Sequence, residues 1–352
     1  MLKQLPVTNS ALHGDAAEKA DFVDGELPGR RNPIRWLVVC GILLIAAIVI
    51  GTAVMVGNSR DHALESSKRE LENTALLLAH HFDQQLEDAT VPLNDIVVQM
   101  HRSGIASADD FRRQMSTPET HRMLEAKAGN ASKIAGFNIY DAAGVLISSS
   151  EVPVVPFVKV ADRAYFKALK WSPDEARLQI ELVHSRFTGD WKTLIARKAT
   201  GQHGEFLGVV SRAIRPRKFE EFFSLVGLGN DATISMHHHD GQLVARYPQA
   251  DEIIGKNFKA DPKSPAAVLL SMDHGTARLV SPIDGMERLV AIRSLDRFPL
   301  SVVATTTVAS ALAEWRAQTK YLVVAAALSS ASRWRLQGRV PSARTGCSTV
   351  SR

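Results

Sequence analysis

The 352-residue sequence predicts an α+β fold: a long N-terminal helix continuous with a membrane span, then two tandem mixed or antiparallel sheets with helices on one face. Three observations predict it. An uncharged apolar run fills residues 36–57, and a helical stripe of apolar residues follows as far as residue 100. Beyond residue 134, a strand pattern of period two occurs twice in the same order.

The apolar run over residues 36–57 reads WLVVCGILLIAAIVIGTAVMVG and contains no charge. A helix of about 20 residues crosses a hydrocarbon core of roughly 30 Å, so this run predicts a transmembrane helix. It is longer than the apolar core of a signal peptide and begins farther from the N-terminus, so we expect it to be retained. Arg30, Arg31 and Arg35 precede it and favour a cytoplasmic arm over residues 1–35.

The segment after this span predicts a long amphipathic helix. Its apolar residues are spaced by threes, fours and sevens, at Leu64, Leu71, Leu78, Phe82, Leu86, Leu93, Val97 and Met100. Such a stripe must pack against another part of the protein. We therefore expect the helix to continue the membrane span outward and to support the rest of the fold.

The first set of strands begins with IAGFNIY and VLISSS, which are joined by the turn DAAG. A short helix, DRAYFKALK, then precedes three strands, LQIELVHSRF, KTLIARKAT and LGVVSRAI. After a helix over residues 216–225 the order repeats with ATISMHHH, QLVARYP, a helix near residues 264–271, GTARLVSPI, ERLVAIRSL and PLSVVATTT. The repeat predicts two similar lobes.

A second apolar segment, residues 321–331, follows a helix over residues 308–320. Eleven residues are too few to cross a bilayer as a straight helix, so this segment predicts a partial second transmembrane helix. The last stretch, residues 332–352, is rich in Arg and Ser without periodicity, and we expect a disordered basic tail there, as at a truncated or out-of-frame end.

The order of these elements resembles the double Cache, or tandem PAS-like, sensor domains of bacterial transmembrane receptors of the histidine kinase or diguanylate cyclase type. The segments that carry the resemblance are FNIYDAAGVLISSS, DRAYFKAL, ISMHHHDGQLVARYP and LAEWRAQ, and it covers about residues 36–331. It implies a chain anchored in the bacterial inner (plasma) membrane that binds a small molecule on the periplasmic side, in its membrane-distal lobe. No output domain can be assigned after Arg333.

With this resemblance, the organisation has a sensor over residues 58–316. Its expected parts are the long helix with the membrane-distal lobe (58–215), the membrane-proximal lobe (216–307) and the exit helix (308–320).

The resemblance places the ligand between the distal sheet and the helical insertion, which contains Asp162, Arg163, Tyr165 and Phe166. The chemistry fits, because an Arg binds a carboxylate through two hydrogen bonds, an Asp binds an ammonium group, and a Tyr offers an apolar wall with a polar tip. The alternative is that Asp162 caps the helix while Tyr165 and Phe166 pack in the core.

Three further ligand-binding candidates come from the strands that follow, Arg186, Thr188 and Arg212. Arg186 ranks first, because the alternation of LQIELVHSRF places it on one face with Ile180, Leu182 and His184. A charge at the end of an apolar face requires a partner. The residues of the turn itself are expected to face solvent.

Metal, cofactor, catalytic and nucleic-acid sites are not predicted. His237, His238 and His239 are adjacent on a strand, so at most two of them share a face, and no third ligand is placed by spacing. No catalytic signature occurs in the body, and the net charge of +5 forms no basic stripe with aromatic residues.

The sequence therefore predicts a membrane-anchored periplasmic receptor, not an enzyme, which binds an amino acid, an amine or an organic acid. It is expected to form a homodimer through the long helix. Two alternatives stay open: the chain is the input half of a truncated or frameshifted diguanylate cyclase or histidine kinase, or it is a ligand-free membrane-anchored scaffold.

Overall fold

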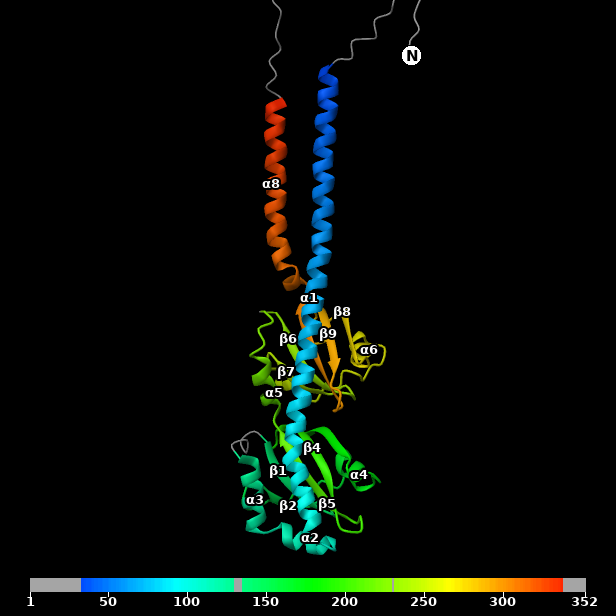
Figure 1. The fold of residues 1–352 in the computed structure, drawn as a ribbon, viewed down its shortest axis with the longest axis vertical. Helices are drawn as coiled ribbons and strands as arrows, with labels where there is room; N and C mark the ends of the chain where they lie inside the picture. The colour runs from blue at the N-terminus through cyan, green and yellow to red at the C-terminus, as the bar shows by residue number, and fades with distance from the viewer. Residues whose placement is uncertain (1–32, 130–134, 230, 338–352) are drawn as a thin grey trace, which may run out of the picture.

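The computed structural model describes residues 33–129, 135–229 and 231–337. One helix, α1 (Pro33–Arg102), runs for 70 residues along both lobes (Figure 1). The lobe nearer the apolar end of α1 is the proximal lobe, and the other is the distal lobe. The cytoplasmic arm expected over residues 1–35 falls almost entirely outside the described residues.

The apolar N-terminal part of α1 is its membrane-spanning candidate. Within the described part of the chain, α1 alone is long and apolar enough to cross a membrane, with a mean hydropathy of 2.9 in its most apolar stretch. Large apolar side chains from Trp36 to Met55 are exposed. The helix passes residue 57 without a break, so the span and the amphipathic segment form one continuous helix.

The distal lobe contains a fully antiparallel sheet in the order β2-β1-β5-β4-β3. Its strands are β1 (Ala135–Asp141), β2 (Leu146–Ser149), β3 (Leu178–His184), β4 (Trp191–Thr200) and β5 (Phe206–Ile214). The helical insertion between β2 and β3 is α4 (Ala164–Lys170).

Two helices of the distal lobe, α2 (Ala108–Met115) and α3 (Pro118–Ala128), were not among those expected from the sequence. Their start signals are present. The hydroxyls of Ser107 and Thr117 each accept a hydrogen bond from the backbone N–H three residues later. Pro118 also occupies the first turn of α3.

The proximal lobe repeats the sheet in the order β7-β6-β10-β9-β8, again antiparallel throughout. The elements are α5 (Pro216–Phe223), β6 (Thr233–His238), β7 (Leu243–Tyr247), η2 (Asp251–Ile253), α6 (Pro265–Leu270), β8 (His274–Val280), β9 (Glu287–Ser294) and β10 (Leu300–Thr307). The tandem repeat predicted from the sequence is confirmed.

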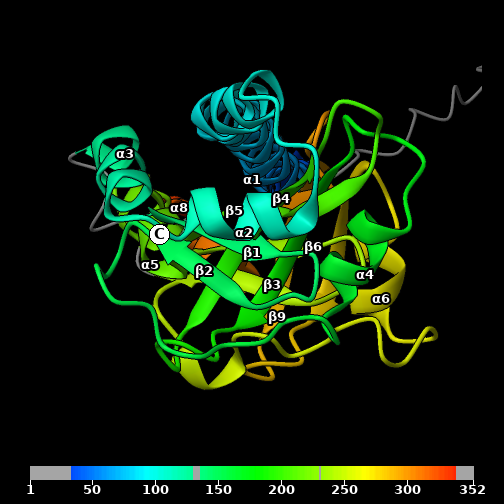
Figure 2. The ribbon, with the colours of Figure 1, turned by 90° about the horizontal axis from the view of Figure 1, so that it is seen from below.

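Helix α1 packs on one face of both sheets, and α4 and α6 lie on the opposite face (Figure 2). Each sheet therefore has helices on both faces, because the long helix adds a layer that the one-face expectation did not include. The buried stripe of α1 includes Leu71, Leu78, Phe82, Leu86, Leu93 and Met100, as its spacing predicted.

The chain leaves the proximal sheet through α7 (Val308–Ala311) and α8 (Ala313–Gln337), and α8 runs beside α1 (Figure 1). The indole Nε1 of Trp315 donates a hydrogen bond of 3.1 Å to the carbonyl of Val56. We expected an irregular tail from residue 332, but α8 continues to Gln337, so the expectation is wrong for residues 332–337. Residues 338–352 lie outside the described residues.

Candidate ligand site in the distal lobe

A narrow cavity lies between the distal sheet and the start of α4, on the face away from α1, with a volume of about 40 Å³. It is lined by Asn138, Tyr140, Leu146, Val158, Val160, Arg163, Tyr165, Val183, His184, Ser185, Arg186, Phe187, Lys192, Leu194 and Ala213. The lining combines aliphatic side chains with a few polar and cationic groups, which is typical of small-ligand sites.

Two arginines hold the segment before α4 against the end of β3. The Arg186 guanidinium donates to both carboxylate oxygens of Asp162 at 2.7 and 2.6 Å, and to the Lys159 carbonyl at 2.6 Å. Arg163 donates to the carbonyl of His184 at 2.8 Å. We call the contacts of Arg186 and Arg163 the latch.

The bidentate bond from Arg186 lowers the pKa of Asp162, so this carboxyl group stays ionised. Asp162 does not cap α4, because Arg163 occupies the N-cap position. The side chain of Arg163 makes no capping hydrogen bond.

A buried ion pair lies behind the latch. The ammonium group of Lys192 on β4 is 3.1 Å from each carboxylate oxygen of Glu151, and these side chains are 4% and 13% exposed. Neither residue was predicted, since Lys192 stands beside a turn and Glu151 follows β2. Lys192 and Arg186 thus line the cavity, and each is paired with a carboxylate that lies outside the lining.

Polar groups on β1 and α4 face the same cavity. Burial raises the pKa of Tyr140 to about 12 and also raises the pKa of Tyr165, with which Tyr140 interacts, so both phenols keep their protons. The side-chain Oδ1 of Asn138 is buried and has no hydrogen-bond partner among the described residues. Buried polar atoms are usually satisfied, so Asn138 is a candidate contact for a ligand N–H group.

The structure brings together Arg163, Tyr165 and Arg186, and it places Asp162 at the mouth through its bond to Arg186. The other predicted residues lie elsewhere. Phe166 packs in the core with its ring centroid 5.7 Å from that of Phe206.

Thr188 stays in the turn, where its hydroxyl donates to Asp190 and its backbone N–H donates to the Ser185 hydroxyl at 3.1 Å. Arg186 itself lies beyond the end of β3, so the alternation that ranked it does not determine its position.

Arg212 is a correction, because it lies on the opposite face of the sheet. Its guanidinium donates to the Ala89 carbonyl of α1 at 2.9 Å and lies 5.2 Å from the centre of the Phe137 ring. Alternation on β5 explains the position, since the neighbouring Ala213 is the residue that lines the cavity. The same alternation in FNIY, applied to β1, could have identified Asn138 and Tyr140.

Comparisons with known proteins agree with this fold. Residues 58–315 match the Cache domain family, dCache_1. No curated protein of similar sequence was found. The extracellular domain of the histidine kinase rpHK1S-Z16 is 29% identical with a TM-score of 0.59, covering 69% of this chain and 95% of its own.

Two chemoreceptor domains share the fold at lower identity. The periplasmic sensory domain of Campylobacter jejuni Tlp1 is 11% identical with a TM-score of 0.55, covering 71% of this chain and 98% of its own. The ligand-binding domain of Pseudomonas fluorescens CtaA, in complex with L-isoleucine, is 17% identical with a TM-score of 0.50. The match covers 73% of this chain and 98% of the CtaA domain. With a family match across most of its length, this chain belongs to the Cache domain family of sensor domains.

Proposed function

We propose that the chain is a membrane-anchored receptor of the bacterial inner membrane whose distal lobe faces the periplasm and binds a small zwitterion, best matched by an amino acid. The observation that carries this proposal is a small cavity lined by Arg163, Arg186 and Lys192, two of which are paired with carboxylates that adjoin the lining. A ligand carboxylate fits Arg163, Arg186 or Lys192, which line the cavity. A ligand ammonium group fits Glu151 or Asp162, the carboxylates paired with two of these cations. The L-isoleucine complex of CtaA supports the same ligand class.

Ligand entry requires the latch to open, since the cavity of about 40 Å³ has little more room than a water molecule. Within the chain, Arg186 and Lys192 are satisfied by carboxylates and Arg163 by the carbonyl of His184. A zwitterion would replace these internal partners with its own two charges. Binding would thereby reposition the latch relative to the sheet, which is the differential contact that a shift between two states requires.

The sheet provides a route from the cavity to α1. Strands β4 and β5 present Lys192 and Ala213 to the cavity and Arg197 and Arg212 to the helix. Arg197 donates to Asn94 at 2.6 Å, and Arg212 contacts the turn of α1 that contains Pro92. Proline removes one hydrogen bond from that turn, so the helix is more easily bent there. Ligand binding would shift α1 relative to α8.

We also propose that two copies pair along α1. Exposed apolar side chains interrupt its polar surface at Leu76, Leu77, Val91 and Val98, with Leu77 71% exposed. A second copy of the same helix would cover them. The input module of a histidine kinase is the second candidate function, favoured by the 29% identity to the rpHK1S-Z16 domain.

The test is thermal unfolding of the full chain in nanodiscs with amino acids, amines and small carboxylates at millimolar concentration. A ligand at 100 times its dissociation constant adds about 2.7 kcal/mol, a melting shift of several degrees. Arg163→Ala should abolish the shift, whereas Arg122→Ala, an exposed arginine on α3, should keep it. A cooperative transition that no compound shifts would instead support the scaffold alternative.

A further inference from the structure

The proximal lobe contains a second cavity, of about 70 Å³, between its sheet and α6. Most of its wall is apolar and comes from Phe258, Leu269, Leu270, Leu279, Val290 and Val303. The polar part of the wall is concentrated on β6, β7, β9 and β10, where Arg246 and Arg288 face the same space. Both arginines are buried, at 9% and 4% exposure.

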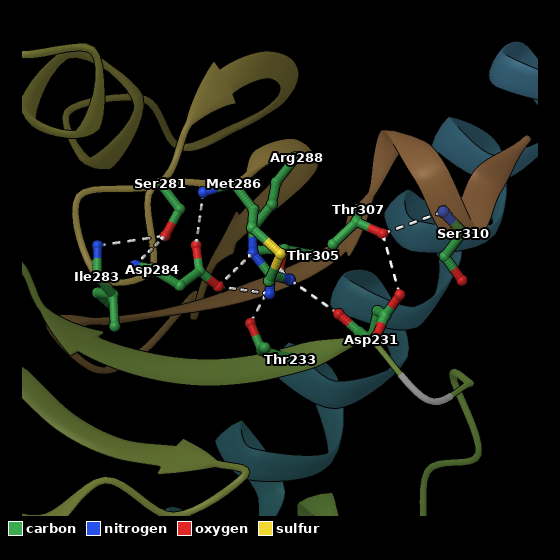
Figure 3. A network of polar contacts seen from close by, with 10 residues as sticks. All are labelled: Asp231, Thr233, Ser281, Ile283, Asp284, Met286, Arg288, Thr305, Thr307 and Ser310. Atoms are coloured by element: carbon green, nitrogen blue, oxygen red, sulfur yellow. Dashed lines mark hydrogen bonds and ion pairs between the residues drawn. The ribbon is translucent and has the colours of Figure 1, made fainter.

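Arg288 makes four hydrogen bonds inside the protein. It donates to Asp284 at 2.6 and 3.0 Å, to the Asp231 carbonyl at 2.9 Å and to the Thr305 hydroxyl at 3.0 Å (Figure 3). Arg246 differs, since its guanidinium makes no hydrogen bond or ion pair with any residue that the structure describes. Burial and the neighbouring Arg288 lower the pKa of Arg246, and Asp284 acts in the opposite direction. Two arginines and one carboxylate leave this group of charges with one excess positive charge.

His237 adds a second unsatisfied group to the same wall. The side chain is buried, with an exposure of 6%. Its Nε2 lies 3.1 Å from the Ser235 hydroxyl, whereas its Nδ1 has no hydrogen-bond partner among the described residues. Burial lowers the pKa of His237 to about 3, so the ring is neutral. Burying a cation and a ring nitrogen without partners costs free energy, unless another molecule supplies the missing hydrogen bonds and the opposite charge.

We propose that the proximal lobe is a second ligand site, which takes a small monocarboxylate with its carboxylate on Arg246 and its short alkyl chain against the apolar wall. One negative charge matches the one unpaired arginine. The cavity volume limits the ligand to an acid of a few carbon atoms. The site uses no residue of the distal cavity and therefore does not depend on the zwitterion proposed there.

The position of the cavity gives the site a route to the exit helix. The Asp231 residue that accepts from Arg288 also accepts, through its carboxylate, a bond of 3.3 Å from the Thr307 hydroxyl. Thr307 in turn caps α7, accepting from the Ser310 N–H at 3.0 Å (Figure 3). An anion beside Arg288 would act on this chain of bonds, and through it on the segment that leads into α8.

The test is thermal unfolding of the full chain in nanodiscs with millimolar sodium propionate, compared with propionamide and with sodium chloride at equal ionic strength. Propionate should raise the melting temperature by roughly 3 °C or more, and the two controls should not. Arg246→Met should abolish the shift while leaving the ligand-free melting temperature at or above that of the wild type, because the methionine removes an unpaired buried charge.

Two matched variants locate the effect. Arg163→Ala, in the distal cavity, and Arg278→Met, an exposed arginine of the proximal sheet paired with Glu287, should both keep the propionate shift. A shift lost in Arg163→Ala and kept in Arg246→Met would place propionate in the distal lobe and overturn the proximal site. No propionate shift, or an equal shift with chloride or propionamide, would also overturn it.

Discussion

The two lobes have the same strand order but hold charge differently in their cavities. In the distal lobe, Lys192 pairs with Glu151 and Arg186 pairs with Asp162, so the cavity is neutralised by its own residues. In the proximal lobe, Arg288 pairs with Asp284, whereas Arg246 has no ion-pair partner among the residues that the structure describes. The difference gives the two proposed sites different modes of binding: a ligand would exchange partners with the distal charges and would supply a missing partner in the proximal lobe.

The lobes also reach the membrane helices at different points. The distal sheet contacts α1 through Arg197 and Arg212, on either side of Pro92. The proximal cavity connects through Arg288 and Thr307 to the start of α7. Both sheets pack on α1, and the proximal lobe has in addition a direct link to the segment that leads into α8.

The largest expected effect comes from breaking the buried pair of the distal cavity. Lys192→Met leaves the Glu151 carboxylate without its partner and should lower the free energy of unfolding by about 3 kcal/mol. Chemical denaturation of the full chain in detergent measures it. Glu151→Gln in the same chain should recover most of the loss, because the isolated charge is then gone.

Arg246→Met is the matched substitution in the proximal lobe. It should change the free energy of unfolding by less than about 1 kcal/mol, since no ion pair is broken. Similar losses in both variants would contradict the contrast between the lobes.

A smaller effect is expected from the pH dependence of the proximal lobe. Burial, with the nearby charges of Arg246 and Lys259, lowers the pKa of His237 from 6.5 to about 3. Below pH 6.5 the unfolded chain binds a proton at His237, whereas the folded chain does not bind it until about pH 3. The contribution of the neutral His237 to the free energy of unfolding is therefore present above pH 6.5 and lost as the pH falls. Stability should fall by at most about 1.4 kcal/mol per pH unit in this window.

His237→Gln should flatten that dependence, measured as the melting temperature from pH 7 to pH 5. His203→Gln, in an exposed turn, is the control and should leave the slope unchanged. Equal slopes in wild type and His237→Gln would show that His237 is not responsible.

The sequence predicts the repeat and the long helix because both depend on local periodicity. The buried stripe of Phe82 and Leu86 has helical spacing, and the strands of both lobes alternate in period two. Helices α2 and α3 are short, and their start signals at Ser107 and Thr117 stand outside any long periodic segment. They were therefore missed.

The site was predicted only in part, because its pairs join residues far apart in the chain. Local chemistry identified Arg163 and Tyr165, but Lys192 meets Glu151 across 41 positions, which no local pattern encodes. Arg212 was placed in the wrong layer because a charge on a strand was read without the alternation of its neighbours. That Arg246 is buried without an ion-pair partner among the described residues also depends on how distant segments pack, which the local sequence does not show.

The smallest effect on stability is expected from the latch. Asp162→Asn removes one charge of a pair whose side chains are 63% and 41% exposed, so the melting temperature should change little. The mouth of the distal cavity would no longer be held, and the amino acid with the largest melting shift should associate several-fold faster in stopped-flow measurements. An unchanged association rate would show that the latch does not limit entry.

The central claim, that the distal lobe binds a small zwitterion, is tested most directly by hydrogen–deuterium exchange of the full chain in nanodiscs. Exchange is compared with and without the amino acid that gives the largest melting shift. The account predicts slower exchange in residues 158–166 and 183–187, which form the latch and line the cavity. Protection confined to the proximal lobe, or no protection in either segment, would contradict it.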